Sequence, residues 1–360
     1  MQLFHANRQW STRPQDERFS TLDSMHEACK AYAERAGEKM VPWSTLRVEA
    51  SGDEVVLTGR GGVPAVPTHY AFGQLAQRIG APANYLRALP ATLAAQNLNH
   101  GLKEKGEGEA NLLFHNNATL VLRAVTSEKY ARIWNYEVTA RLLDLTSRHN
   151  LVPARATAGF GLQGEAANDD AALYASDHDM FAFLMDRNRS VRDPGGAAMF
   201  RGIIVANSEV GDCALKVMGF WFRDICSNHI IWGAEEIAEV RLSHIGQVRD
   251  RWITATARIR RYLDSGTSFE SAAFQEVTRT IADTKDGVLD AIFQKRIPGL
   301  TRKALEASYD AVVSDEDGSP RTAWGMAQGI TRYAQSATGQ YADERTDLDR
   351  AAGKLLSVKF

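Results

Sequence analysis

The sequence predicts an α+β fold: an antiparallel sheet with a central β-hairpin and interleaved helices, then a helical C-terminal region. Residues 200–232 contain two runs rich in β-branched and aromatic residues around the polar turn 207–212, which is the pattern of a hairpin. From about residue 234 onward, apolar residues recur at helical spacing. We therefore expect N-terminal helix and strands over 1–64, an α+β core over 65–233 and a helical region over 234–360.

The first hundred residues are expected to form short elements. The apolar residues of 21–39 follow helical spacing, and those of 43–48 and 55–57 follow the pattern of strands. Three short helices come next, each opened by a residue suited to a cap or a first turn: Thr68, Pro82 and Pro90.

A pair of strands and a long helix are expected after these. Strand-like runs lie within 112–125 on both sides of the turn 115–117, and a helix is predicted over 127–149. In the simplest interpretation, Ser127 caps this helix. The sharper alternative is an anion site at the helix start, aided by Arg123 and Lys129.

Further strands are predicted over 155–162 and 180–185. The segment 186–197 is expected to be a loop, because its Pro194-Gly195-Gly196 disfavours regular structure. After the hairpin, a helix is predicted near residue 250 from an apolar stripe at spacings of three and four: Val248, Trp252, Ala255, Ile259 and Leu263.

Arginines lie on both flanks of that stripe. Arg249 and Arg260 fall on one flank, and Arg251, Arg258 and Arg261 fall on the other. A helix of this kind can pack by its stripe and hold phosphates with its flanks. The alternative is a solvated helix whose arginines serve no ligand.

Bulk composition narrows the class of protein. The chain has 360 residues, 44% hydrophobic and 24% charged, with a formal net charge of −2, so contact with nucleic acid must come from a local basic patch. No apolar run approaches the ~18 residues that span a bilayer, and the N-terminus lacks the apolar segment of a signal peptide. Cys29, Cys213 and Cys226 form no close pair, which is typical of a reduced, cytoplasmic protein.

Motifs for metal or nucleotide chemistry are weak. Asp177-His178-Asp179 is the one metal-like cluster, but only its two aspartates share a strand face, so we interpret them as solvated residues and expect no metal. A GxGxxG occurs at 159–164 in acidic surroundings, which favours a glycine-rich turn over a dinucleotide site. Cys213 and Cys226 lie in strand patterns and are expected to be small buried hydrophobes. We expect no cofactor.

Five segments occur in a recognisable order: RAVTSEKYARIWNYEV, SDHDMFAFLMDR, FRGIIVANSEVGDCALKV, ICSNHIIWG and TAWGMAQGITRYAQ. Together they resemble a family of phage/plasmid-like proteins, domain of unknown function 932 (UPF0380-like), over roughly residues 65–340. The resemblance implies a mobile genetic element as context, without implying a reaction. It also singles out a set of polar positions: Arg123, Ser127, Tyr130, Asn135, Asp179, Asn207, Ser208, Cys226 and Asn228.

The leading hypothesis is a nucleic-acid-binding accessory protein of a phage or plasmid, acting in DNA recombination or single-strand annealing. Its partner would be single- or double-stranded DNA and not a membrane, its location cytoplasmic, and a homo-oligomer stays open. The predicted binding residues are basic: Arg123, Lys129, Arg249, Arg251, Arg258, Arg260 and Arg261.

Two alternatives belong to other classes. One is a metal-dependent enzyme acting on nucleic acid or a nucleotide, whose catalytic candidates would be Asp177, Asp179, Asn207, Ser208 and Asn228. The other is an anti-defence protein that binds a protein partner. The absence of a recognised catalytic spacing in the sequence favours binding over catalysis.

Overall fold

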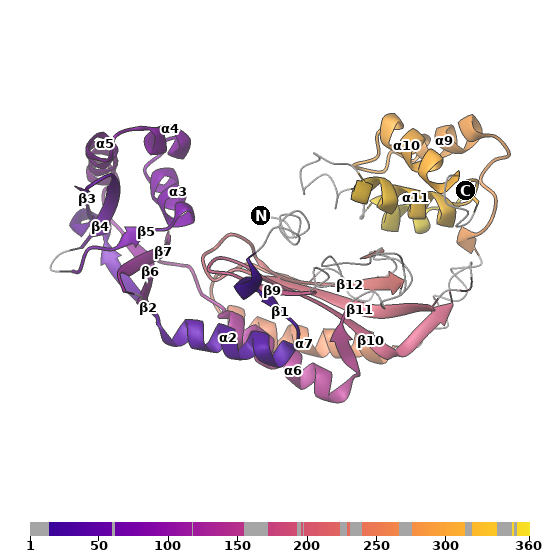
Figure 1. Cartoon of the computed structure of the whole chain (residues 1–360), viewed down its shortest axis with the longest axis horizontal. Helices are drawn as coiled ribbons and strands as arrows, with labels where there is room; N and C mark the ends of the chain where they lie inside the picture. Colours follow the sequence, from indigo (N-terminus) through magenta and orange to yellow (C-terminus); the bar gives the residue numbers. More distant parts are fainter. Residues whose placement is uncertain are drawn as a thin grey trace.

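The computed structural model confirms the α+β class. It describes residues 14–59, 62–116, 118–154, 172–192, 196, 198–223, 229–230, 240–265, 276–313, 319–336, 348 and 351–360. Figure 1 shows an N-terminal part on the left, a long central sheet with helices beneath it, and a group of C-terminal helices on the right.

The N-terminal part is built on a 4-stranded sheet of order β2-β6-β7-β5, in which only the β5–β7 pair is parallel. Its strands are β2 (Ala36–Pro42), β5 (Val66–Pro67), β6 (Glu109–Asn116) and β7 (Leu120–Ser127). A separate hairpin and three helices complete it: β3 (Arg47–Ser51), β4 (Glu54–Thr58), α3 (His69–Arg78), α4 (Ala83–Ala88) and α5 (Ala91–Glu104). Thr68 caps α3 by accepting from the Ala71 N–H at 3.1 Å, as predicted.

The central part is an 8-stranded antiparallel sheet. Along its main path lie β1 (Arg18–Phe19), β9 (Leu173–Ala175), β10 (Met180–Arg192), β11 (Ala198–Asn207), β12 (Leu215–Arg223) and β13 (His229–Ile230). β8 (Leu151–Pro153) pairs with β10, and β14 (Val240–Leu242) pairs with β12. β11 and β12 form the predicted hairpin in the middle of the sheet, with Val205 opposite Val217.

Three helices cover one face of this sheet (Figure 1): α2 (Leu22–Glu34), α6 (Asn135–Arg148) and α7 (Val248–Asp264). Alternate strand residues such as Leu184, Ile203 and Val205 point into this core. The predicted stripe of α7 is buried here at every position: Val248, Trp252, Ala255, Ile259 and Leu263.

The C-terminal helices α9 (Lys285–Gln294), α10 (Arg302–Val313) and α11 (Ala323–Ser336) form a further core. Val191 of β10 and Met199 of β11 belong to that core, so the far end of the hairpin sheet packs into the helical region. α10 and α11 approach closely, since a Cβ at Gly329 would lie 2.2 Å from the Ser308 carbonyl oxygen.

Four predicted elements differ from the structure. The strand expected over 43–48 begins only at Arg47, as β3, because Trp43–Thr45 form a short 3-10 helix. The helix expected over 21–39 ends at Glu34, because the next residues pair with β6 as strand β2. The helix expected over 127–149 begins only at Asn135, because Ser127 is the last residue of β7 and pairs with Ala110. The expected cap at Ser127 is therefore wrong.

The predicted loop at 186–197 is also largely wrong, because β10 continues to Arg192. The pairing register of β10 with β11 is irregular between Met185 and Ser190, where the polar residues lie. Regular pairing then resumes at Ser190 and continues to Arg192, which lies opposite Ala198. The strand expected over 155–162, the GxGxxG at 159–164 and the candidates Cys226 and Asn228 lie outside the described residues.

The expected ranges 1–64, 65–233 and 234–360 do not coincide with the hydrophobic cores. One core combines β3 and β4 with α3, α5, β6 and β7 across residue 64. Another combines α7 with the central sheet across residue 233. No helix within the described residues is long and apolar enough to span a membrane.

Candidate functional site

Most of the polar candidates meet around the loop that joins β11 to β12. This loop lies against β7 and α3 of the N-terminal part and against the start of α6. We call the cluster the polar junction and define it by its members: Arg123, Tyr130, Asn135, Ser176, Asp177, His178, Asp179, Asn207, Ser208 and Glu209.

A buried ion pair lies at the centre of the polar junction. Arg123 Nη2 is 3.0 Å from Glu209 Oε2, and the two side chains are 1% and 2% exposed. The same guanidinium donates from Nε to the Asp177 carbonyl at 3.0 Å. Glu209 Oε1 also accepts from the Asn135 backbone N–H at 2.8 Å. Arg123, predicted to bind nucleic acid, is therefore an interior residue whose charge is already neutralised.

Asn207 and Ser208 hold the loop by hydrogen bonds. Asn207 Nδ2 donates to Asn135 Oδ1 at 2.8 Å and to the Ile133 carbonyl at 3.0 Å. Ser208 Oγ donates to the His178 carbonyl at 2.6 Å. The Tyr130 hydroxyl donates to the Ser208 carbonyl at 3.0 Å. These catalytic candidates are both buried, and the bonds explain them as loop-positioning residues.

The turn 176–179 places a serine, a histidine and two aspartates together without forming a catalytic triad. Ser176 Oγ and Asp177 Oδ1 lie 3.2 and 2.9 Å from the same ring nitrogen, Nδ1 of His178. A proton relay needs the serine and the carboxylate on opposite nitrogens. Ser176 Oγ instead donates to Asp179 Oδ1 at 2.6 Å.

Two pKa values at this turn are shifted. The hydrogen bond from His178 holds the pKa of Asp177 below its usual value, against the effect of burial. Burial by itself would lower the pKa of His178, but the hydrogen bond to Asp177 and the charge of Asp179 raise it above its usual value.

The two cysteines of the described residues, Cys29 and Cys213, are buried. Burial raises the pKa of both Cys29 and Cys213 to about 12, so these thiols are protonated near neutral pH. Within the described ranges, no group of three or more His, Cys, Asp or Glu side chains is placed to hold a metal ion.

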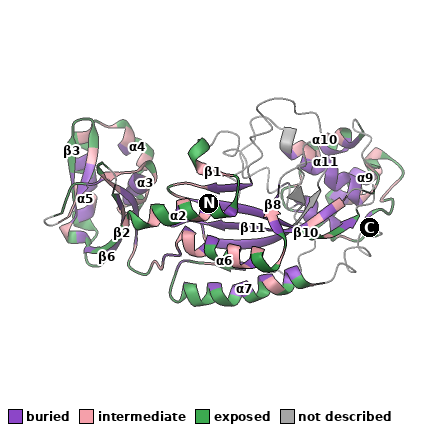
Figure 2. Ribbon diagram, turned by 60° about the horizontal axis from the view of Figure 1, so that its bottom comes forward, coloured by how far each residue is buried: buried purple, intermediate pink, exposed green. Residues whose placement is uncertain are grey.

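The α7 arginines form a second candidate site. Arg249 Nε lies 3.2 Å from Glu137 Oε1, and Arg260 forms an ion pair with Asp144, so α6 neutralises this flank. Lys129 lies exposed in the turn after β7, and α6 begins only at Asn135. Arg261 is exposed on the outer side of α7, whose solvent-facing surface Figure 2 shows along the helix.

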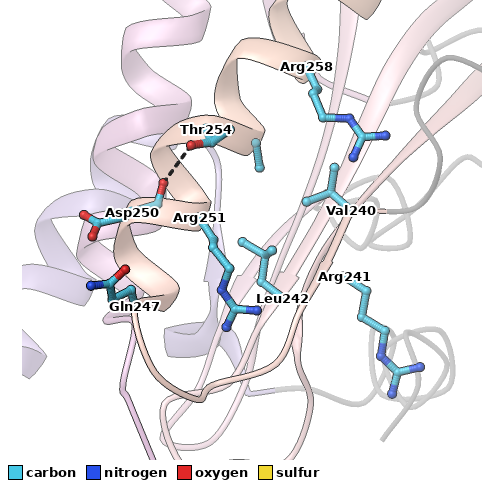
Figure 3. A pocket seen from close by; sticks show the side chains of 9 residues that line it. Val240, Arg241, Leu242, Gln247, Asp250, Arg251, Thr254 and Arg258 are labelled. Atoms are coloured by element: carbon cyan, nitrogen blue, oxygen red, sulfur yellow. Dashed lines mark hydrogen bonds between the residues drawn. The ribbon is translucent and has the colours of Figure 1, made fainter.

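The other flank of α7 borders β14 and forms a groove of about 340 Å³. We call it the basic groove; its lining is Val240, Arg241, Leu242, Gln247, Asp250, Arg251, Thr254, Ala255 and Arg258. In Figure 3 the guanidinium groups of Arg241, Arg251 and Arg258 lie on the same side, and the Asp250 carboxylate lies on the other side of the helix. Arg251 Nη2 donates to the carbonyls of Ser243 and Ile245 at 2.9 and 2.7 Å.

Arg241 and Arg258 are both exposed, and no carboxylate of the described chain forms an ion pair with either of them. Sequence reasoning missed Arg241, which lies in a short strand with no pattern of its own. It also missed Glu209, which looks like an ordinary turn residue. The only signal for Glu209 is its place two residues after Asn207, at the hairpin turn.

In the comparison with protein families, a model described as a domain of unknown function (DUF932) matches residues 123–353. Neither the curated proteins nor the solved structures include a match to the chain. The matched range contains the whole polar junction and the basic groove.

Proposed function

The chain belongs to the DUF932 family, and from this premise we propose that it is a nucleic-acid-binding accessory protein of a phage or plasmid, acting in recombination or strand annealing. The observation that carries the proposal is the basic groove, in which Arg241 and Arg258 present guanidinium groups that no carboxylate of the described chain neutralises.

The chemistry of this surface fits a phosphate backbone. A guanidinium donates two parallel hydrogen bonds to a phosphate and stays charged at any physiological pH. The net charge of −2 gives no general attraction for nucleic acid, so a local cluster must supply it. Arg241 and Arg258 come from a strand and a helix held together by the sheet core, so the spacing of their backbone positions is fixed before binding.

The cytoplasm is the proposed location, on the ground that Cys29 and Cys213 are free thiols buried in the described core. The proposed partner is DNA, contacted mainly at its phosphates. A homo-oligomer remains compatible with this arrangement.

The test is a titration of the full chain with single- and double-stranded DNA over a range of salt concentrations. Each phosphate contact contributes about 0.9 to the slope of log K against log salt for duplex DNA. We expect the Arg241→Gln/Arg258→Gln variant to reduce that slope by about two and to weaken binding at low salt.

The matched control is Arg249→Gln/Arg260→Gln, which removes the same charge from groups already paired with α6. We expect it to leave the slope nearly unchanged. If both variants reduce the salt dependence of DNA binding equally, the basic groove is not the surface that contacts DNA. No DNA binding by the wild type at low salt would overturn the proposal, and binding of a protein partner would then be the better reading.

A further inference from the structure

One buried guanidinium outside the polar junction lacks most of its hydrogen-bond partners. Arg132 lies in the segment between β7 and α6, and its side chain is 1% exposed. Its Nε donates to Glu38 Oε1 at 2.8 Å. Its Nη1 and Nη2 are buried and have no hydrogen-bond partner among the described residues. Four N–H bonds of a permanent cation are therefore left without an acceptor, which is costly in an interior.

Aromatic rings flank this guanidinium but do not replace the missing acceptors. Its central carbon lies 5.1 Å from the centre of the Tyr130 ring and 5.6 Å from that of Trp134. Such contacts stabilise the charge through the ring faces. The N–H bonds lie in the guanidinium plane and still need oxygen atoms at its edge.

A second polar atom close by is also unsatisfied. Asn111 Nδ2 donates to Glu38 Oε1 at 3.3 Å, the same oxygen that accepts from Arg132. Asn111 Oδ1 is buried and has no donor. Exchanging the amide nitrogen and oxygen would set Oδ1 against the Glu38 carboxylate, so a flipped amide does not explain it. The described residues thus leave cationic donors and one acceptor open around Glu38.

We propose that Arg132 and Asn111 form a binding site for a phosphate group. Anionic phosphate oxygens accept from Nη1 and Nη2 of Arg132 in the two-pronged manner that guanidinium favours. A phosphate hydroxyl, present on the monoanion and dianion of inorganic phosphate, donates to Asn111 Oδ1. A simple carboxylate has no such hydrogen and satisfies only the arginine.

Glu38 has two roles at this site. It fixes Arg132 through Nε, and its side chain is 36% exposed. Its negative charge also opposes an incoming anion. This site is separate from the basic groove. Arg132 is buried, whereas Arg241 and Arg258 of the groove are exposed.

The experiment is a calorimetric titration of the full chain with inorganic phosphate and, separately, with acetate at the same ionic strength. We expect saturable phosphate binding and weaker binding of acetate. Arg132→Lys keeps the charge but loses the planar pair of donors, and we expect about tenfold weaker phosphate binding. Arg249→Lys, on the exposed face of α7, is the matched control and should bind as the wild type does.

The Glu38→Gln variant distinguishes two roles of Arg132: binding of phosphate, or only an ion pair with Glu38 that stabilises the fold. If Arg132 receives phosphate, removal of the competing negative charge should tighten binding several-fold, even though the ion pair is lost. This variant also serves if Arg132→Lys does not fold. Absence of phosphate binding, unchanged or weaker binding in Glu38→Gln, or loss of binding in Arg241→Gln/Arg258→Gln instead would each overturn the site.

Discussion

Arginines of the polar junction and of the basic groove are the same residue type in opposite surroundings. Arg123 is 1% exposed and bonded to Glu209 and to a carbonyl, so its charge holds the chain together. Arg241 and Arg258 are exposed beside a groove without a carboxylate partner in the described chain. The contrast shows that the role of a basic residue cannot be inferred from its sequence position alone. It depends on which acidic residues lie beside it in the folded chain.

The largest effect should come from breaking the buried pair. Arg123→Met leaves the Glu209 carboxylate buried. Within the described residues, its remaining hydrogen-bond donor is the Asn135 backbone N–H. We expect a loss of about 3–5 kcal/mol in the free energy of unfolding, measured with urea. Arg258→Met, the matched change in the groove, should stay within about 0.5 kcal/mol of the wild type.

A double variant sharpens this comparison. Arg123→Met/Glu209→Met removes both charges and should recover much of the lost stability, because no unpaired ion remains. A single Arg123→Met variant as stable as the wild type would show that the pair contributes little to the fold.

A smaller effect should appear as a dependence of stability on pH. Burial lowers the pKa of His244 to about 4 from 6.5, opposed by its bond to the Ala131 carbonyl. Below pH 6.5 the unfolded chain therefore takes up a proton that the folded chain does not. Stability should fall by about 3 kcal/mol as the pH goes from 6.5 to about 4, with no contribution from this group above that window.

His178 of the polar junction should act with the opposite sign. Its raised pKa contributes stability that is fully present below pH 6.5 and is lost as the pH rises through its folded value. His244→Gln should flatten the acid loss, and His178→Gln should leave it in place. An acid profile of unfolding that is identical in His244→Gln and the wild type would contradict the assignment.

The smallest effect distinguishes Arg251 from its neighbours in the groove. Its two hydrogen bonds to the carbonyls of Ser243 and Ile245 hold the segment between β14 and α7 against the first turn of α7. Because the side chain is exposed, we expect Arg251→Gln to cost about 1 kcal/mol in thermal or urea unfolding. Arg258→Gln, which has no such bonds, should change stability less than Arg251→Gln does.

Local patterns predicted much of the fold. The hairpin of β11 and β12 and the buried stripe of α7 depend on residue periodicity within one segment, and both are confirmed. The start of α6 was missed because Ser127 looks like a cap, whereas pairing with Ala110 draws it into β7. The length of β10 was missed because its pairing with β11 outweighs the polar composition of the segment.

The site was predicted only as a set of residues, not as their roles. Tyr130, Asn135, Asp179, Asn207 and Ser208 do gather at one place. The pairing of Arg123 with Glu209 was not predicted, because the two residues lie 86 positions apart in the chain. The pairing of Arg260 with Asp144 spans 116 residues, and no pattern in either segment indicates it.

β10 begins in the core beneath the central sheet and ends in the core of the C-terminal helices, and the antiparallel β11 runs back from the second core to the first. The two strands pair within both cores, with a register irregularity between Met185 and Ser190, so they link the helical region directly to the hairpin. The helices α9 to α11 also shield Val191 and Met199. Removing those helices would expose these apolar side chains at the end of the sheet, and an exposed apolar patch promotes association, so the helical region protects the sheet against aggregation.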